Sequence, residues 1–95
     1  MGDLSGKELL DRLLSSTIKI EILILFRKNP NLIDSLEGIA SRIEHSSSEV
    51  TPEVEDLVRL GIISKVSRDD AEVYLLDPEE DRKIQKAISE YIKEL

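Results

Sequence analysis

The 95-residue sequence contains no cysteine and very few aromatic residues. The absence of cysteine excludes disulfides, thiolate metal sites and a cysteine nucleophile. Phe26, Tyr74 and Tyr91 are the only aromatic residues, too few for the base-stacking platform of a single-strand binder. The longest unbroken apolar run, Ile22 to Phe26, is far shorter than the ~20 residues of a membrane span. We therefore expect a protein without a membrane segment.

The sequence also lacks an excess of positive charge. Thirteen lysines and arginines oppose twenty aspartates and glutamates, for a net charge of -7. A DNA-binding role would therefore need a local basic surface. Residues 1–7 show no signal-peptide pattern, so we expect a soluble, cytoplasmic protein.

Sequence signals of catalysis and of cofactor binding are missing as well. No serine, lysine or carboxylate stands in a recognisable catalytic motif, and there is no glycine-rich phosphate loop. The single histidine, His45, is interpreted as a surface turn residue, because without cysteine a metal site would have to be built from carboxylates alone. We expect neither an enzyme, nor a metal site, nor a cofactor.

The length predicts one domain over residues 1–95, which can bury roughly 60% of its unfolded surface. Leucines at helical spacing predict an amphipathic helix over residues 4–15. Ser16 or Thr17 is expected to cap a second helix that runs to Lys28, before Asn29-Pro30. Its β-branched start alternates like a strand, but its twelve residues favour a helix.

Two further helices are predicted around the polar turn His45-Ser46-Ser47-Ser48. The first is capped by Asp34 or Ser35 and runs to Glu44, weakened slightly by Gly38. The second ends at Leu60, with Gly61 as its C-cap. Proline is tolerated only near the start of a helix, so Pro52 favours a cap at Ser47 or Ser48.

A β-hairpin and a terminal helix complete the predicted fold. Residues 62–66 and 72–76 are rich in β-branched and apolar side chains and flank a polar turn over residues 67–71. Asp77 before Pro78 is typical of an N-cap, and an apolar stripe then runs from Ile84 to Leu95. The predicted class is mainly α with a small β-hairpin (α+β).

The order of these motifs resembles a winged helix-turn-helix domain with extra N- and C-terminal helices. Two short helices meet at a serine turn, and the exit Leu60-Gly61-Ile62-Ile63 leads into the hairpin. The segments from Leu36 to Ala40 and from Ser48 to Val54 resemble the helix pair of the arsenic-resistance and multiple-antibiotic-resistance repressor families. The resemblance covers a core of residues 17–77, flanked by terminal helices over residues 4–15 and 78–95.

The resemblance implies a transcription regulator that binds double-stranded DNA. In those families the second helix of the pair enters the major groove and the hairpin wing contacts the backbone or minor groove. On the second helix, the residues that the resemblance implies to face DNA are Ser47, Ser48, Glu49, Thr51, Pro52 and Glu55. The predicted DNA-binding residues are Ser47, Ser48, Thr51, Arg59, Lys65 and Arg68. Lys65 and Arg42 are candidates for phosphate contacts, which position a protein without specifying sequence.

The charge of the second helix departs from the family pattern. Residues 46–60 contain Glu49, Glu53, Glu55 and Asp56 against the single cation Arg59. Among base edges of the major groove, only cytosine N4 offers a carboxylate a donor. The alternative hypothesis is therefore a protein-interaction module whose acidic helix docks on a basic partner protein.

Three further alternatives remain open on the sequence. The serine turn either binds a phosphate through helix N-terminal amides or is only a cap. Arg68 either inserts into a minor groove or is an unpartnered turn residue. The apolar stripes of the terminal helices either form a homodimer, the preferred interpretation, or pack within one chain over residues 18–26.

Overall fold

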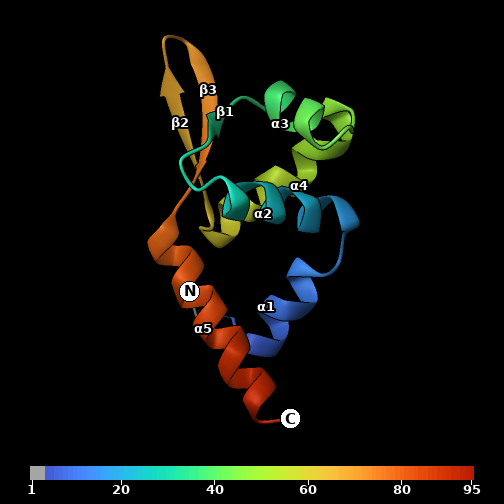
Figure 1. Ribbon diagram of the computed structural model, residues 1–95, viewed down its shortest axis with the longest axis vertical. Coiled ribbons are helices and arrows are strands. Elements are labelled where there is room, and N and C mark those ends of the chain that lie inside the picture. Colours follow the sequence, from blue (N-terminus) through green and yellow to red (C-terminus); the bar gives the residue numbers. More distant parts are fainter. Residues whose placement is uncertain (1–3) are drawn as a thin grey trace.

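The computed structural model describes residues 4–95. Met1–Asp3 lie outside the described residues; they begin the segment in which we expect no signal peptide. It contains helices beside and below a small three-stranded sheet, in the chain order expected for a winged helix (Figure 1). The elements are α1 (Gly6–Leu13), α2 (Thr17–Lys28), β1 (Ile33–Asp34), α3 (Leu36–Arg42), α4 (Ser47–Leu60), β2 (Ile63–Arg68), β3 (Ala71–Leu76) and α5 (Pro78–Lys93). The predicted α+β, winged-helix-like fold with extra terminal helices is confirmed.

Serine and aspartate caps fix the start of each helix. Ser5 caps α1 in a capping box with Glu8, Ser16 caps α2, and Ser35 caps α3. Asp77 accepts hydrogen bonds from two backbone amides of the first turn of α5, with Pro78 as the first helical residue. These side chains satisfy amides that have no partner inside the helix, which explains why the helices begin close to the predicted residues.

The start of α4 differs from the prediction. Its N-cap is Ser46, not Ser47 or Ser48, and Glu49 completes a capping box by accepting from the Ser46 amide at 3.2 Å. Pro52 therefore lies in the second turn, and it has no N–H to donate to the Ser48 carbonyl. Both residues are exposed, so water can satisfy that carbonyl. The reciprocal Ser46–Glu49 bonds explain the earlier start.

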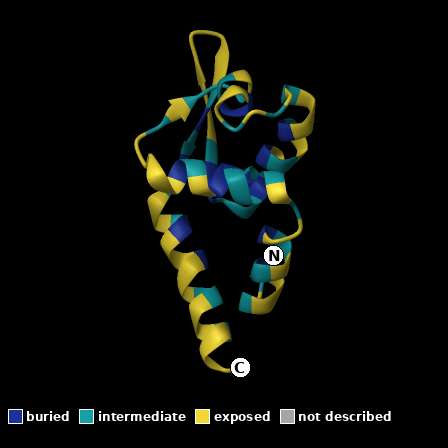
Figure 2. Cartoon of the chain, turned by 45° about the vertical axis from the view of Figure 1, so that its right-hand side comes forward, coloured by how far each residue is buried: buried dark blue, intermediate teal, exposed yellow. Residues whose placement is uncertain are grey.

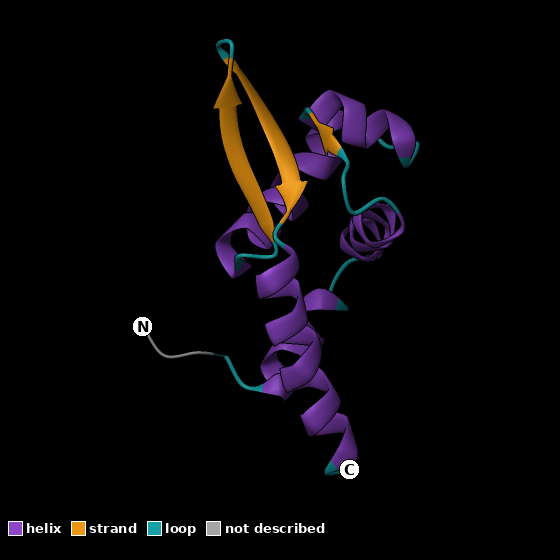
Figure 3. Ribbon diagram, turned by 60° about the vertical axis from the view of Figure 1, so that its left-hand side comes forward, coloured by secondary structure: helices purple, strands orange, loops and turns teal. Residues whose placement is uncertain are grey.

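The sheet contains one strand that the sequence did not indicate. The short strand β1 pairs with β3 on the side opposite β2, giving the antiparallel order β1-β3-β2. The β2–β3 ladder extends to Arg68 and Ala71, so the turn is limited to Asp69 and Asp70, with φ of 49° and 64°. The hairpin is therefore longer than predicted and projects as a wing beyond the rest of the molecule (Figure 3).

The core lies where α2, α3 and α4 meet the base of the wing (Figure 2). Its fully buried side chains include Ile22, Phe26, Ile39, Val54 and Leu57. The terminal helices α1 and α5 pack on each other and extend away from this core, as Figure 1 shows. Part of their apolar surface is therefore buried within one chain, as expected if the terminal helices pack intramolecularly. The rest of that surface stays exposed.

Candidate nucleic-acid interface

Helix α4 presents one exposed stripe opposite its buried side. Val50, Val54 and Leu57 are buried against the core. Residues 48, 52, 55 and 59 follow the i, i+4, i+7, i+11 spacing that places side chains along one helix face. They are all exposed, and they are Ser48, Pro52, Glu55 and Arg59. We call these four residues the outer stripe of α4; it contains one acid and one base.

Two of the other acids of α4 face α1 and α2 in a polar cluster. The Asp56 carboxylate accepts hydrogen bonds from the Arg12 guanidinium, with Nε at 3.1 Å from Oδ1, and from Lys19 Nζ at 2.6 Å. Glu53 lies 3.6 Å from Lys19 Nζ. We call Arg12, Lys19, Glu53 and Asp56 the Lys19 cluster. Two cations and two anions cancel there, so these acids add no net charge to the outer stripe.

Lys19 is the buried centre of this cluster. Only 4% of the residue is exposed. Its ammonium group donates to the backbone oxygen of Arg12 at 3.1 Å, to Ser15 Oγ at 3.2 Å and to Asp56. An ammonium has three donors, and all three are used. The cluster was not predicted, although a lone lysine within the apolar start of α2 was the available signal.

The two cations also change the acidity of Asp56. Hydrogen bonds from Arg12, and then from Lys19, lower the pKa of the Asp56 carboxyl from 3.8 to about 2, although partial burial opposes the shift. The same bond raises the pKa of Arg12. Asp56 and Arg12 are therefore both charged at neutral pH.

The first turn of α4 is joined to α2 through His45. Its Nε2 lies 3.2 Å from Glu21 Oε1, and its Nδ1 lies 3.8 Å from Glu49 Oε2. Hydrogen bonds from Ser46 lower the pKa of Glu49. His45 is half-buried and in contact with α2 rather than only a surface turn residue. Within residues 4–95, no three His, Asp or Glu side chains are grouped so that they could hold a metal ion.

The predicted hydroxyl residues lie together at the start of α4. Thr51 Oγ1 donates to the Ser47 carbonyl at 2.7 Å, so the threonine proton is used inside the helix. Ser48 Oγ lies 3.1 Å from Ser46 Oγ and is exposed. Ser47 is half-buried. Of the three, Ser48 is the one on the outer stripe.

Most predicted cations have a carboxylate partner. Arg59 lies 3.7 Å from Asp56, and Lys65 pairs with Glu72 across the wing at 2.9 Å, which raises the lysine pKa. Arg42 Nε donates to Asp34 at 2.8 Å. Arg68, at the wing tip, has no ion pair within the described part of the chain. It is therefore the cation best placed to accept a new phosphate partner.

Gly38 makes room for the Asp34–Arg42 pair. A Cβ at position 38 would lie 2.0 Å from Asp34 Oδ1. The glycine was expected only to weaken its helix slightly. Its role is instead to admit the carboxylate that holds Arg42 and also accepts from the Ser35 amide.

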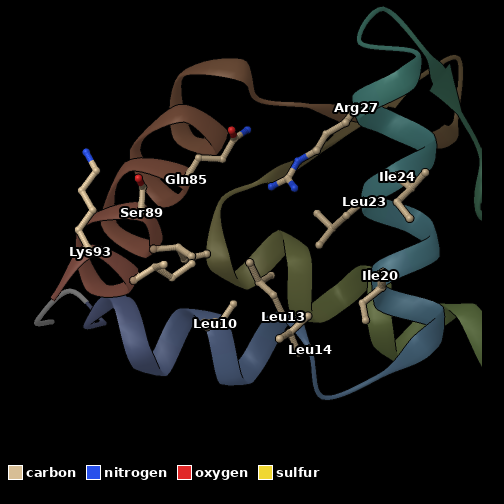
Figure 4. Close-up of a pocket in the computed structure, with 12 residues that line it drawn as sticks. Leu10, Leu13, Leu14, Ile20, Leu23, Ile24, Arg27, Gln85, Ser89 and Lys93 are labelled. Carbon is tan, nitrogen blue, oxygen red and sulfur yellow. The ribbon is translucent and has the colours of Figure 1, made fainter. Parts of the chain in front are cut away.

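A groove of about 570 Å³ opens between α1, α2 and α5 (Figure 4). Its walls are mainly leucine and isoleucine, with Gln85, Ser89 and Lys93 of α5 among its polar residues. Leu14, Ile24 and Ile92 remain 58%, 48% and 51% exposed. Arg27, which also lines the groove, pairs with buried Asp81 at 2.9 Å. The terminal helices thus leave a continuous apolar surface uncovered.

The described residues include no helix long and apolar enough to span a membrane. The element order, the wing and the outer stripe define the class of the molecule as a winged-helix-like protein. Neither a protein-family model nor a curated protein sequence matches the chain.

Three similar solved structures are proteins of Methanosarcina and Sulfolobus species. A possible transcriptional regulator from Methanosarcina mazei Go1 superposes with a TM-score of 0.64 at 16% identity, over 93% of this chain and 80% of that one. The ST1889 protein of Sulfolobus tokodaii gives 0.66 at 15% identity, over 94% and 89%. The transcriptional regulator BldR of Sulfolobus solfataricus gives 0.58 at 15% identity, over 93% and 68%. At these identities the likeness establishes the fold.

Proposed function

We propose that this protein is a DNA-binding transcription regulator in which α4 is the recognition helix and the β2–β3 hairpin is the wing. The observation that carries the proposal is the inward pairing of Glu53 and Asp56 with Lys19 and Arg12. It removes two of the four acids that opposed DNA binding and leaves Ser48 and Arg59 on the outer stripe. The solved structures named as transcriptional regulators support the same function.

The proposed contacts divide by element. On α4, Ser48 and Arg59 face the major groove, with Ser47 and Thr51 beside them at the first turns. On the wing, Lys65 and Arg68 contact phosphates, and Arg68 at the tip is the most accessible of the two. Because phosphate contacts are sequence-independent, the wing contributes affinity, and the outer stripe contributes any base readout.

The protein acts as a homodimer in this proposal. Two-fold pairing through α1 and α5 would cover the apolar groove, and DNA binding by both copies then requires their recognition helices to lie about one DNA turn, ~34 Å, apart. The proposed setting is the cytoplasm, with double-stranded DNA as the partner.

The first prediction concerns Arg68. Binding to a random-sequence duplex of about 40 base pairs, measured by fluorescence anisotropy, should weaken steeply as salt rises. Arg68→Ala should weaken binding and reduce the slope of log K against log salt by about one, because one phosphate contact is lost.

Lys86→Ala is the matched control for this measurement. Lys86 is an exposed cation on α5, away from α4 and the wing, so its removal changes net charge equally but should leave the slope unchanged. No binding at low ionic strength, or equal effects of the two variants, would contradict DNA binding.

The alternative of an acidic docking helix has less support. It depended on four carboxylates along α4, and Glu53 and Asp56 are engaged by cations of the same chain. Glu55 alone remains as an acid of the outer stripe.

A further inference from the structure

In the proposed dimer, two copies of α4 lie at a fixed separation only if α4 has a fixed orientation relative to the terminal helices α1 and α5. Helix α4 packs mainly on α2, α3 and β2, whereas α1 packs mainly on α5. The backbones of α1 and α4 therefore approach each other at few points, although Leu9 and Leu13 of α1 belong to the same apolar core as α4. The Lys19 cluster spans this gap, because Arg12 lies on α1, Lys19 on α2 and Asp56 on α4.

The hydrogen-bond geometry of the Lys19 cluster restricts the orientation of α4 relative to α1, in addition to any stabilisation of the fold. Arg12 presents Nε and Nη2 to Asp56, a fork that restricts the angle of approach. Lys19 donates to Oδ2 of the same carboxylate, which Arg12 Nε also contacts, and to the backbone carbonyl of Arg12 near the end of α1. Apolar residues of similar volume often stabilise a fold as well as a buried ion pair does. Such residues would lack this directionality.

We propose that Arg12, Lys19 and Asp56 are positioning residues that hold the recognition helix α4 at one orientation relative to the terminal helix α1. The inference rests on the proposed function for its consequence in DNA binding, but the orientation itself can be measured without DNA. Arg12 and Lys19 both converge on the Asp56 carboxylate. The loss of Asp56 therefore breaks both links between α1 and α4, and the loss of either cation breaks one, while the apolar core of α4 stays intact.

The absence of cysteine allows two spin labels to be placed at unique sites. Lys7→Cys on α1 and Ser48→Cys on α4 change two exposed residues. The distance between the labels is measured by pulsed electron paramagnetic resonance, with labelled chains diluted in unlabelled protein so that each distance lies within one chain. The otherwise unchanged protein should give one narrow distance distribution.

The decisive variant replaces three residues of the Lys19 cluster with apolar residues: Arg12→Met, Lys19→Met and Asp56→Leu together. It should unfold at a temperature near that of the unchanged protein but give a broadened or shifted distance distribution. Without labels, it should bind the duplex roughly threefold to thirtyfold more weakly. A folded triple variant with the original narrow distribution would overturn the proposal.

A milder pair of variants serves if the triple variant does not fold. Arg12 is partly exposed, so Arg12→Gln removes the fork at little cost to the core. It should broaden the distribution, and Arg12→Lys, which keeps the charge, should narrow it again in part. An unchanged distribution in Arg12→Gln would equally overturn the proposal. If the unchanged protein fails to bind the duplex, the proposed function is contradicted, and the label distances still decide the positioning role.

Discussion

At the scale of single residues, the Asp56 carboxylate links the stability of the fold to pH. Its pKa is about 2 in the folded chain against an ordinary 3.8. Because the folded pKa is the lower one, Asp56 stabilises the fold fully above pH ~4, and that contribution is lost as pH falls through about 2. A shift of this size corresponds to roughly 2 kcal/mol.

We predict that Asp56→Asn has a flatter dependence of unfolding free energy on pH than the unchanged protein between about pH 5 and pH 2. Urea unfolding followed by circular dichroism at several pH values measures it. Asp34 and Glu49, whose pKa values are also lowered, keep part of the dependence in both proteins. Asp69→Asn, at an exposed wing-tip carboxylate, is the control and should parallel the unchanged protein. Parallel curves for Asp56→Asn would refute the assignment.

At the same scale, the sequence predicts which flank of α4 carries its acids but not the partners of those acids. Helical spacing alone places residues 49, 53 and 56 on one flank of α4, beside the outer stripe. Their partners could not be read from the sequence, because Lys19 is 37 residues from Asp56 and Arg12 is 44 residues away. The sequence therefore gives only the summed charge of α4, although half of its acids belong to an internal cluster.

At the scale of elements, the contact between α1 and α5 depends on Gly6. A Cβ at this position would lie 2.3 Å from the Ala87 carbonyl oxygen and 2.7 Å from the Tyr91 Cβ. Alanine is preferred to glycine by about 1 kcal/mol in a helix interior, an upper bound for Gly6 as the first residue of α1, so the two effects have opposite signs. The steric effect should win, because backbone atoms of α5 cannot rotate away.

Gly6→Ala should therefore lower the thermal unfolding midpoint, with a cost of about 1–3 kcal/mol for forcing the two helices apart. Circular dichroism during heating measures the midpoint. A higher midpoint, the result that helix preference alone would produce, would show that α1 and α5 do not approach this closely.

Element boundaries could be predicted from the sequence where a capping side chain defines them. They could not be predicted where they depend on hydrogen-bonded pairing with a distant strand. Asp77-Pro78 and Gly61 were recognised from local chemistry alone. Strand β1 has two residues and exists only because Ile33 and Asp34 pair with β3, far along the chain. Pro52 predicts a cap at Ser47 or Ser48, whereas the reciprocal bonds of Ser46 and Glu49 place the cap at Ser46.

At the scale of the whole molecule, the uncovered groove predicts the assembly state. Ile92 is 51% exposed in the single chain, so replacing it does not disturb the core. In the proposed homodimer it is buried twice, once in each copy. Ile92→Glu would place two carboxylates in an apolar interface, which should raise the dissociation constant by roughly a hundredfold or more.

Sedimentation velocity over a range of concentrations measures this effect, and circular dichroism checks that the variant is folded. Lys86→Glu is the control, because Lys86 is exposed, does not line the groove and lies about 120° around α5 from Ile92. We expect the unchanged protein and Lys86→Glu to sediment as dimers and Ile92→Glu as a monomer. A monomeric unchanged protein would mean that α1 and α5 serve only to pack on each other within one chain. Two copies of α4 would then not be held at a fixed separation, and DNA binding would be limited to single sites.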